Sequence, residues 1–254
     1  MAKIIAEQLL DYLVEAGVKR IYAVTGDSLN YINEAVRKDG RLQWIHVRHE
    51  EVGAYAAAAE AELDGIACCA GSCGPGHVHL INGVYDAHKS HVPLIVIAST
   101  INTPEMGMGY FQETNTYKLF DDCSCYNTAA QAPRIIQSAI QHAISLKGVA
   151  VIGLPGDISE LPAVESPNAT QFFNTTPLIR PNDLELSHIA QLINESASTT
   201  IFCGLGAEEA HAEVVKLAAH IKAPVGYTFR GKMAIQPNNP YEIGMTGLLG
   251  QPAA

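Results

Sequence analysis

The chain has 254 residues, which is enough for one large domain or two smaller ones, each with a buried core. Its 16 Lys and Arg against 26 Asp and Glu give a formal net charge of -10. This balance argues against nucleic acid or an anionic membrane surface as the main partner. No apolar run reaches the roughly 18 to 20 residues of a membrane span, and the acidic N-terminal segment is unlike a signal peptide. We therefore expect a cytoplasmic protein.

Apolar residues at helical spacing predict a first helix that ends near Gly17 and is followed by a short buried strand at 20–24. The alternation then continues. Strands are predicted at 44–47, 66–70, 94–98 and 149–154, and helices at 28–38, 51–62, 77–88 and 133–147. Continuously apolar strands are typical of a sheet that is covered on both faces. The pattern therefore predicts an α/β fold, a doubly wound parallel sheet with helices on both faces, over residues 1–155.

A proline-rich stretch without helical periodicity follows, and we expect residues 156–181 to be a linker. The α/β pattern resumes in residues 182–254. A helix is predicted at 183–195, a strand at 200–203, a Gly-Leu-Gly turn at 204–206, a helix that ends near 221 and a strand at 225–228. Because two strands are too few for a self-sufficient sheet, we expect this second α/β domain to be incomplete, cut short within the domain.

The six cysteines show no zinc or redox spacing. Three lie in apolar, strand-like runs: Cys68, Cys69 and Cys203. The other three are expected in turns or loops: Cys73, Cys123 and Cys125. All six are therefore interpreted as buried or loop thiols of a reducing compartment.

Three turns that follow predicted strands are candidate ligand sites, since parallel sheets bind ligands at the carboxyl ends of their strands. The first contains Gly26, which an ordinary glycine turn with an Asp or Ser helix cap explains equally well. The second places Glu50 among four consecutive ionisable residues, more than helix capping requires. The third, Gly-Ser-Cys-Gly-Pro-Gly at 71–76, would let the backbone approach a ligand closely. It lacks the lysine of a phosphate-binding loop, and its glycines do not have the spacing of the dinucleotide-binding motif.

His49 and Glu50 are not followed by the second histidine of a zinc protease helix, so no metal ligand is predicted.

Together these segments resemble one enzyme family. The strings RHEEVGAYAAAAEAELDG (48–65), GSCGPGHVHLINGVYDAHKSHVPLI (71–95) and GYFQET (109–114) strongly resemble the thiamine-diphosphate enzymes of the pyruvate oxidase and acetolactate synthase group. FRGK (229–232) and GMTGLLG (244–250) are most similar to the flavin-dependent pyruvate oxidases and quinone-dependent pyruvate dehydrogenases. The resemblance covers the whole chain.

The resemblance implies three successive α/β domains, of which this sequence matches the pyrimidine-binding domain completely and the central, FAD-binding domain about halfway. The third domain of the family binds Mg²⁺ and the diphosphate through a Gly-Asp-Gly…Asn-Asn signature, which this sequence lacks. Its nearest approach is Gly156-Asp157, expected at the exit of the last strand of the first domain. We therefore expect the Mg²⁺ and diphosphate ligands to lie outside this chain, and the chain alone to bind little FAD and to be inactive.

The resemblance also implies roles for individual residues. Glu50 corresponds to the catalytic glutamate that shares a proton with the pyrimidine ring and thereby favours its imino tautomer. The family's other contacts to thiamine diphosphate match Gly26, Ser72, Pro75 and Gly76. Positions near the substrate match His79, Phe111 and Gln112. Contacts to FAD match Gly204, Gly206, Arg230, Thr246, Gly247 and Leu248. Glu51 is interpreted as a solvated neighbour without a catalytic role.

The function that we expect is therefore oxidative decarboxylation of pyruvate by a thiamine-diphosphate and FAD enzyme, with electrons passed to a quinone or another acceptor. Two alternatives stay open: a carboligase of the acetolactate synthase type, and a non-catalytic binding or assembly chain. The resemblance implies a homo-oligomer, a dimer or tetramer, with the active site between two subunits. Membrane association of the intact protein is not expected to involve this chain.

Overall fold

The computed structural model describes residues 3–127, 131–164, 171–173 and 179–251. The chain divides into two compact units, Met1–Pro177 and Leu178–Ala254. No helix in the described part of the chain is both long and apolar enough to cross a membrane.

The first unit is built on a six-stranded sheet in which every described strand pair is parallel. The strand order is β2-β1-β3-β4-β6-β5. The bounds are β1 (Arg20–Ala23), β2 (Gln43–His46), β3 (Ala67–Gly71), β4 (Leu94–Thr100), β5 (Ser124–Asn127) and β6 (Val149–Pro155). Every residue of β3 and β6 is buried, because helices cover both faces of the central strands. The predicted doubly wound parallel sheet is confirmed.

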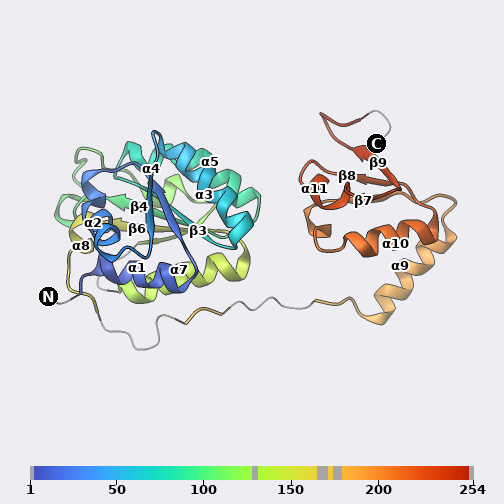
Figure 1. Cartoon of the computed structure of the whole chain (residues 1–254), viewed down its shortest axis with the longest axis horizontal. Coiled ribbons are helices and arrows are strands. Elements are labelled where there is room, and N and C mark those ends of the chain that lie inside the picture. The colour runs from blue at the N-terminus through green and yellow to red at the C-terminus, as the bar shows by residue number, and fades with distance from the viewer. Residues whose placement is uncertain (1–2, 128–130, 165–170, 174–178, 252–254) are drawn as a thin grey trace. The chain divides into compact units, whose positions relative to one another are not determined.

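Helices pack on both faces of this sheet (Figure 1). One face carries α1 (Ile5–Glu15), α2 (Asn30–Asp39) and α7 (Ala132–Leu146), and the other carries α3 (Glu50–Asp64) and α5 (Ile81–Lys89). The alanine-rich sequence of α3 lets it approach α5 closely. A Cβ atom on Gly83 of α5 would lie 2.5 Å from the Cβ of Ala54, so larger residues at this crossing would separate the helices.

Some elements differ from the sequence prediction. The range 77–88, predicted as one helix, contains the end of α4 (Pro75–His79) and most of α5, and the predicted helix at 28–38 begins with a 3₁₀ turn at Asp27–Leu29. The assignment of Cys125 to a turn or loop was wrong, because Cys125 lies in β5. This strand was missed because it has only four residues, at the edge of the sheet, without an apolar or β-branched run.

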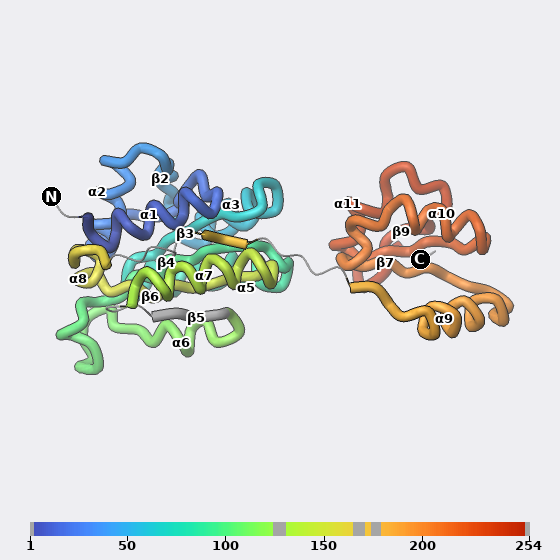
Figure 2. The backbone as a smooth tube through the Cα atoms, turned by 90° about the horizontal axis from the view of Figure 1, so that it is seen from below, coloured from blue at the N-terminus to red at the C-terminus, as the bar shows by residue number. Residues whose placement is uncertain are grey.

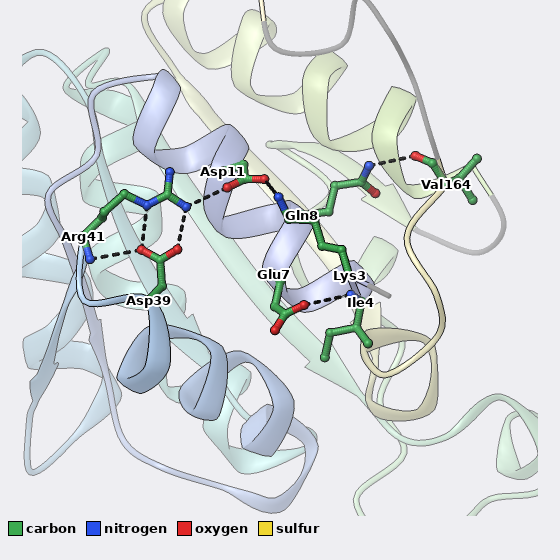
Figure 3. A network of polar contacts seen from close by, with 8 residues as sticks. All are labelled: Lys3, Ile4, Glu7, Gln8, Asp11, Asp39, Arg41 and Val164. Atoms are coloured by element: carbon green, nitrogen blue, oxygen red, sulfur yellow. Dashed lines mark hydrogen bonds and ion pairs between the residues drawn. The ribbon is translucent and has the colours of Figure 1, made fainter. Parts of the chain in front are cut away.

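The N-terminal segment holds the chain that follows β6 and α8 (Gly156–Ser159). The Ile5 amide donates to the Leu161 carbonyl oxygen at 2.9 Å, and the Gln8 side chain donates to the Val164 carbonyl oxygen at 2.8 Å (Figure 3). Nearby, Asp11 of α1 accepts hydrogen bonds from Lys3 and, at 2.6 Å, from Arg41 (Figure 3). Figure 2 shows α1 beside α7, with strands of the sheet behind them. The first part of the range expected to be a linker therefore packs on the first unit.

The second unit contains a smaller parallel sheet in the order β7-β8-β9. Its strands are β7 (Ile201–Cys203), β8 (Val225–Tyr227) and β9 (Glu242–Met245), and its helices are α9 (Asp183–Glu195), α10 (His211–Ile221) and α11 (Lys232–Ile235). Five buried residues form its core: Cys203, Ala218, Val225, Tyr227 and Ile235. The prediction of a second α/β unit is confirmed, and β9 is a strand that the sequence pattern did not reveal.

Candidate functional site

The turns that follow β1 and β3 meet at the carboxyl edge of the larger sheet. From β1 the chain continues to β2 on one side, and from β3 it continues to β4 on the other side. Such switch points in the strand order are where doubly wound sheets bind ligands. A Cβ atom on Gly26 would lie only 2.4 Å from the Cβ of Ser72, and one on Gly76 would lie 2.6 Å from Ser72 Oγ. The structure therefore brings Gly26, Ser72 and Gly76 together, and the close contact with the Ser72 side chain favours glycine at position 26.

Hydrogen bonds join the same turns to neighbouring strands. The Cys73 amide donates to Ser28 Oγ at 3.0 Å. The Ser99 hydroxyl, at the end of β4, lies 2.8 Å from the Ser28 carbonyl oxygen and 3.1 Å from that of Leu154 in β6. Because these groups are buried or partly buried, their bonds fix the relative positions of four strand ends.

Glu50 is the first residue of α3 and is buried, with a relative exposure of 8%. Three residues separate Glu50 from the end of β2. Its Oε2 atom lies 3.0 Å from Nδ1 of His79, in α4. His49 caps α3, since its Nδ1 atom accepts a hydrogen bond from the Glu51 amide at 3.3 Å. The carboxylate thus lies at a helix N-terminus, where the helix dipole favours negative charge.

His49 and His79 stack with their ring centroids 4.4 Å apart and their planes 23° from parallel. Together with Glu50 they offer ligand atoms within 4.8 Å of one another, a spacing that a metal ion could draw together. Lone pairs of imidazole nitrogens lie in the ring plane, so those of two nearly parallel rings run side by side and do not converge on one ion. The arrangement supports a positioned carboxyl group better than a metal centre.

His77, in α4, is a buried residue that connects the 71–76 turn to neighbouring segments. It is completely buried, its Nδ1 atom lies 3.0 Å from the Ser99 carbonyl oxygen, and its Nε2 atom bonds the Thr114 hydroxyl. Burial lowers the pKa of His77, so we assign the neutral ring, with Nδ1 as donor and Nε2 as acceptor. In the sequence, His77 is only a histidine that follows Pro-Gly. Its structural role becomes visible only through its contacts with Ser99 and Thr114.

A cavity of about 380 Å³ adjoins the 71–76 turn. Phe111 and Gln112 line it, whereas Glu50 and His79 are not among its lining residues. Gln112 packs on the turn, because a Cβ atom on Gly74 would lie 2.7 Å from the Gln112 Cβ. Phe111 is 79% exposed. Sequence reasoning missed the acidic lining of this cavity, which consists of Asp27, Glu105, Asp157 and Glu160.

Gly156-Asp157 lies at the end of β6, as predicted. The Asp157 carboxylate accepts hydrogen bonds from the amide and the hydroxyl of Thr103, so it ties the segment after β4 to the start of α8. This role is structural and uses both carboxylate oxygens.

In the second unit, the turns after β7, β8 and β9 share the carboxyl edge of the small parallel sheet. They contain Gly204, Arg230 and Thr246, three of the residues predicted to contact FAD. Two of the turns touch, since a Cβ atom on Gly231 would lie 2.9 Å from the Cys203 carbonyl oxygen. Less constrained positions are Gly206, where a Cβ atom would have no neighbouring atom within 4 Å, and Leu248, which is fully exposed.

The comparisons with known proteins agree with this division of the chain. Residues 4–119 match the family model of the thiamine pyrophosphate enzyme N-terminal TPP binding domain, and residues 186–254 match the model of the thiamine pyrophosphate enzyme central domain. One matched region lies in each of the two compact units.

Three relatives illustrate the range of similarity. An uncharacterized 42.6 kDa protein of Pseudomonas amyloderamosa is 46% identical over 252 residues, which are 97% of this chain and 64% of that protein. The pyruvate oxidase of Lactiplantibacillus plantarum is 35% identical over 246 residues, 94% of this chain and 41% of that protein. The acetolactate synthase of Arthrospira platensis is 29% identical over 258 residues, 95% of this chain and 44% of that protein.

The chain thus spans between 41% and 64% of the length of these relatives. The two family models together cover most of the chain and come from one family. The chain therefore carries the N-terminal and central domains of the thiamine pyrophosphate enzymes.

Proposed function

We propose that this chain forms the pyrimidine-binding half of a thiamine-diphosphate site in an enzyme that oxidatively decarboxylates pyruvate. Electrons would pass through FAD to a quinone or another acceptor. The observation that carries the proposal is the Glu50 carboxyl group, buried at the start of α3 and held by His79 at 3.0 Å. The pyruvate oxidase relative, at 35% identity, supports this reaction over that of the acetolactate synthase relative, at 29%.

The residues present fit the pyrimidine part of the cofactor. His79 engages Oε2 of Glu50, which leaves Oε1 as the atom that would bond the pyrimidine ring nitrogen. The Ser72 side chain leaves no room for a side chain at position 26, so the Gly26 backbone would lie against the ring. Gly26 and the Ser72, Pro75 and Gly76 backbone would hold the ring, with His79, Phe111 and Gln112 on the substrate side.

When bound, thiamine diphosphate supplies the nucleophilic carbon that attacks a 2-oxo acid. Glu50 would hold a proton at the pyrimidine ring nitrogen. Ligands for Mg²⁺ and the diphosphate would come from outside this chain, and a second subunit would complete the site. Gly204, Gly206, Arg230 and the 246–248 turn would contact FAD.

The test of this proposal is Glu50→Gln in the full-length enzyme. Glutamine keeps the shape of the side chain but cannot exchange the proton, so we expect proton exchange at the thiazolium C2 carbon and pyruvate turnover to fall about 10²- to 10⁴-fold. Glu51→Gln is the matched control, because Glu51 accepts a hydrogen bond from Asn82 at 3.0 Å and so contacts α5. Equal slowing by both substitutions, or none by Glu50→Gln, would show the assignment to be wrong.

A carboligase of the acetolactate synthase type is the second candidate, and the acetolactate synthase relative favours it. Product analysis separates the two reactions. An oxidase consumes one pyruvate per acceptor reduced, whereas a carboligase joins two pyruvates and needs no acceptor. Formation of one acetolactate for every two pyruvates consumed, without an acceptor, would replace our proposal with this candidate.

A further inference from the structure

The carboxylate of Glu113 organises the loop that precedes it. Its Oε1 atom accepts a hydrogen bond from the Gly107 amide at 2.5 Å, and its Oε2 atom accepts from the amides of Gly109 and Tyr110 at 2.8 and 3.1 Å. The Glu113 amide in turn donates to the Tyr110 carbonyl oxygen at 2.9 Å. Gly107 and Gly109 have φ angles of +84° and +67°, and this left-handed backbone directs their amides toward one acceptor.

The other end of the loop is fixed to the core. Thr114, the residue after Glu113, bonds the buried His77 ring. Gln112 has a φ of +66°, unusual for a residue with a side chain, and its Oε1 atom lies 3.4 Å from the Cys73 sulfur. Two sets of contacts therefore hold Phe111 and Gln112 in place. The first is the hydrogen bonds of Glu113 to the amides of residues 107–110, and the second is the contacts of Thr114 with His77 and of Gln112 with Cys73.

The three amides select a carboxylate. Hydrogen bonds from the backbone amides, that of Gly107 first, hold the pKa of Glu113 below its usual value, so the group is ionised at neutral pH. A glutamine would present two N–H donors in place of one of the acceptor oxygens, and these would oppose the loop amides. An aspartate would keep the charge but, one methylene shorter, would not reach all three amides.

We propose that Glu113 is a positioning residue, whose carboxylate holds the loop so that Phe111 and Gln112 line the cavity beside the candidate active site. The proposal rests on the proposed function, because it takes Phe111 and Gln112 to contact the 2-oxo acid. Glu113 itself acts only through the loop: its three hydrogen bonds all go to backbone within residues 107–110.

The first measurement is amide hydrogen exchange on the 254-residue chain. Glu113→Gln should speed exchange at Gly107, Gly109 and Tyr110 about 10-fold, as expected when a charge-assisted hydrogen bond is lost. The control Glu62→Gln changes an exposed acid on α3 and should leave these amides unchanged. Unchanged exchange in Glu113→Gln, with the fold intact, would overturn the role of the carboxylate.

The second measurement uses the full-length enzyme. Glu113→Gln should raise KM for pyruvate and lower kcat/KM about 10-fold or more, while the affinity for thiamine diphosphate stays the same. Glu113→Asp should lie between the wild type and Glu113→Gln. A side chain that only stabilised the fold would lower the melting temperature without moving KM.

The two proposals fail in different ways. If Glu50→Gln slows C2 exchange but Glu113→Gln leaves KM unchanged, the positioning role is wrong and the proposed function stands. If Glu113→Gln loosens the loop but Glu50→Gln has no effect on C2 exchange, the proposed function is wrong, and with it the proposal that the loop serves a 2-oxo acid.

Discussion

The contact between Gly26 and Ser72 can be tested by adding a single methyl group. In Gly26→Ala, the new Cβ would lie 2.4 Å from Ser72 Cβ and 2.6 Å from Ser72 Oγ. Carbon atoms in proteins pack at about 3.5 to 4 Å, so the two turns must separate by more than about 1 Å. The φ of Gly26 is -159°, extended backbone that alanine adopts readily, so the cost comes from packing.

We expect Gly26→Ala to lower the free energy of unfolding of the first unit by about 1 to 2 kcal/mol. Overpacking costs about 1 to 3 kcal/mol, and the loss of glycine flexibility in the unfolded chain returns about 0.4 to 1 kcal/mol. Urea denaturation followed by fluorescence measures this, because Trp44 is the only tryptophan and lies in β2, packed against the core of this unit.

A double-mutant cycle isolates the contact. Ser72→Gly removes both atoms that the new methyl group would meet, so adding it to Gly26→Ala should restore stability, with a coupling energy of about 1 kcal/mol or more. Gly148→Ala is the control, since a Cβ there has no atom within 4 Å, and it should change stability by less than about 0.5 kcal/mol. A Gly26→Ala chain as stable as wild type, or one that Ser72→Gly does not rescue, would refute the contact and the candidate site built on it.

Two further predictions concern stability. Burial alone would raise the pKa of Asp11, but hydrogen bonds from Arg41 and Lys3 leave it below its usual value, and Arg41 likewise lowers the pKa of Asp39 (Figure 3). Acids with a lowered folded-state pKa stabilise above their unfolded pKa near 4, so urea titrations should show this contribution disappearing as the pH falls below about 4. Arg41→Met should weaken that dependence, with a remainder from the Lys3–Asp11 contact. His77→Ala should cost about 2 to 4 kcal/mol, since it opens a cavity and leaves the buried Ser99 carbonyl without its donor; a loss under about 1 kcal/mol in the same Trp44 assay would contradict this.

Much of the fold was predictable because it follows from local patterns. Continuous apolar strands alternating with amphipathic helices specify a parallel sheet covered on both faces, and the prediction agrees with β1 to β4 and β6. It failed where the local signal was weak. β5 is a short edge strand, and its register depends on pairing with β6 rather than on an apolar run of its own.

The candidate site divides in the same way. The sequence alone pointed to Glu50 and to the turns at Gly26 and 71–76, through residue types and a family resemblance. Which of these turns touch depends on β1 lying between β2 and β3, a strand order that no local pattern encodes.

His77 and Glu113 show the limit most clearly. In the sequence each is one polar residue among others, compatible with an exposed surface. Only the tertiary structure buries His77 against Ser99, and only the folded conformation of the loop directs three of its amides at Glu113. The two partners of His77, Ser99 and Thr114, lie 22 or more residues away in the chain. Such contacts form only once the sheet has brought the strand ends together. The sequence by itself therefore determined the order and kind of the elements, whereas the packing of the sheet decided which side chains meet at its edge.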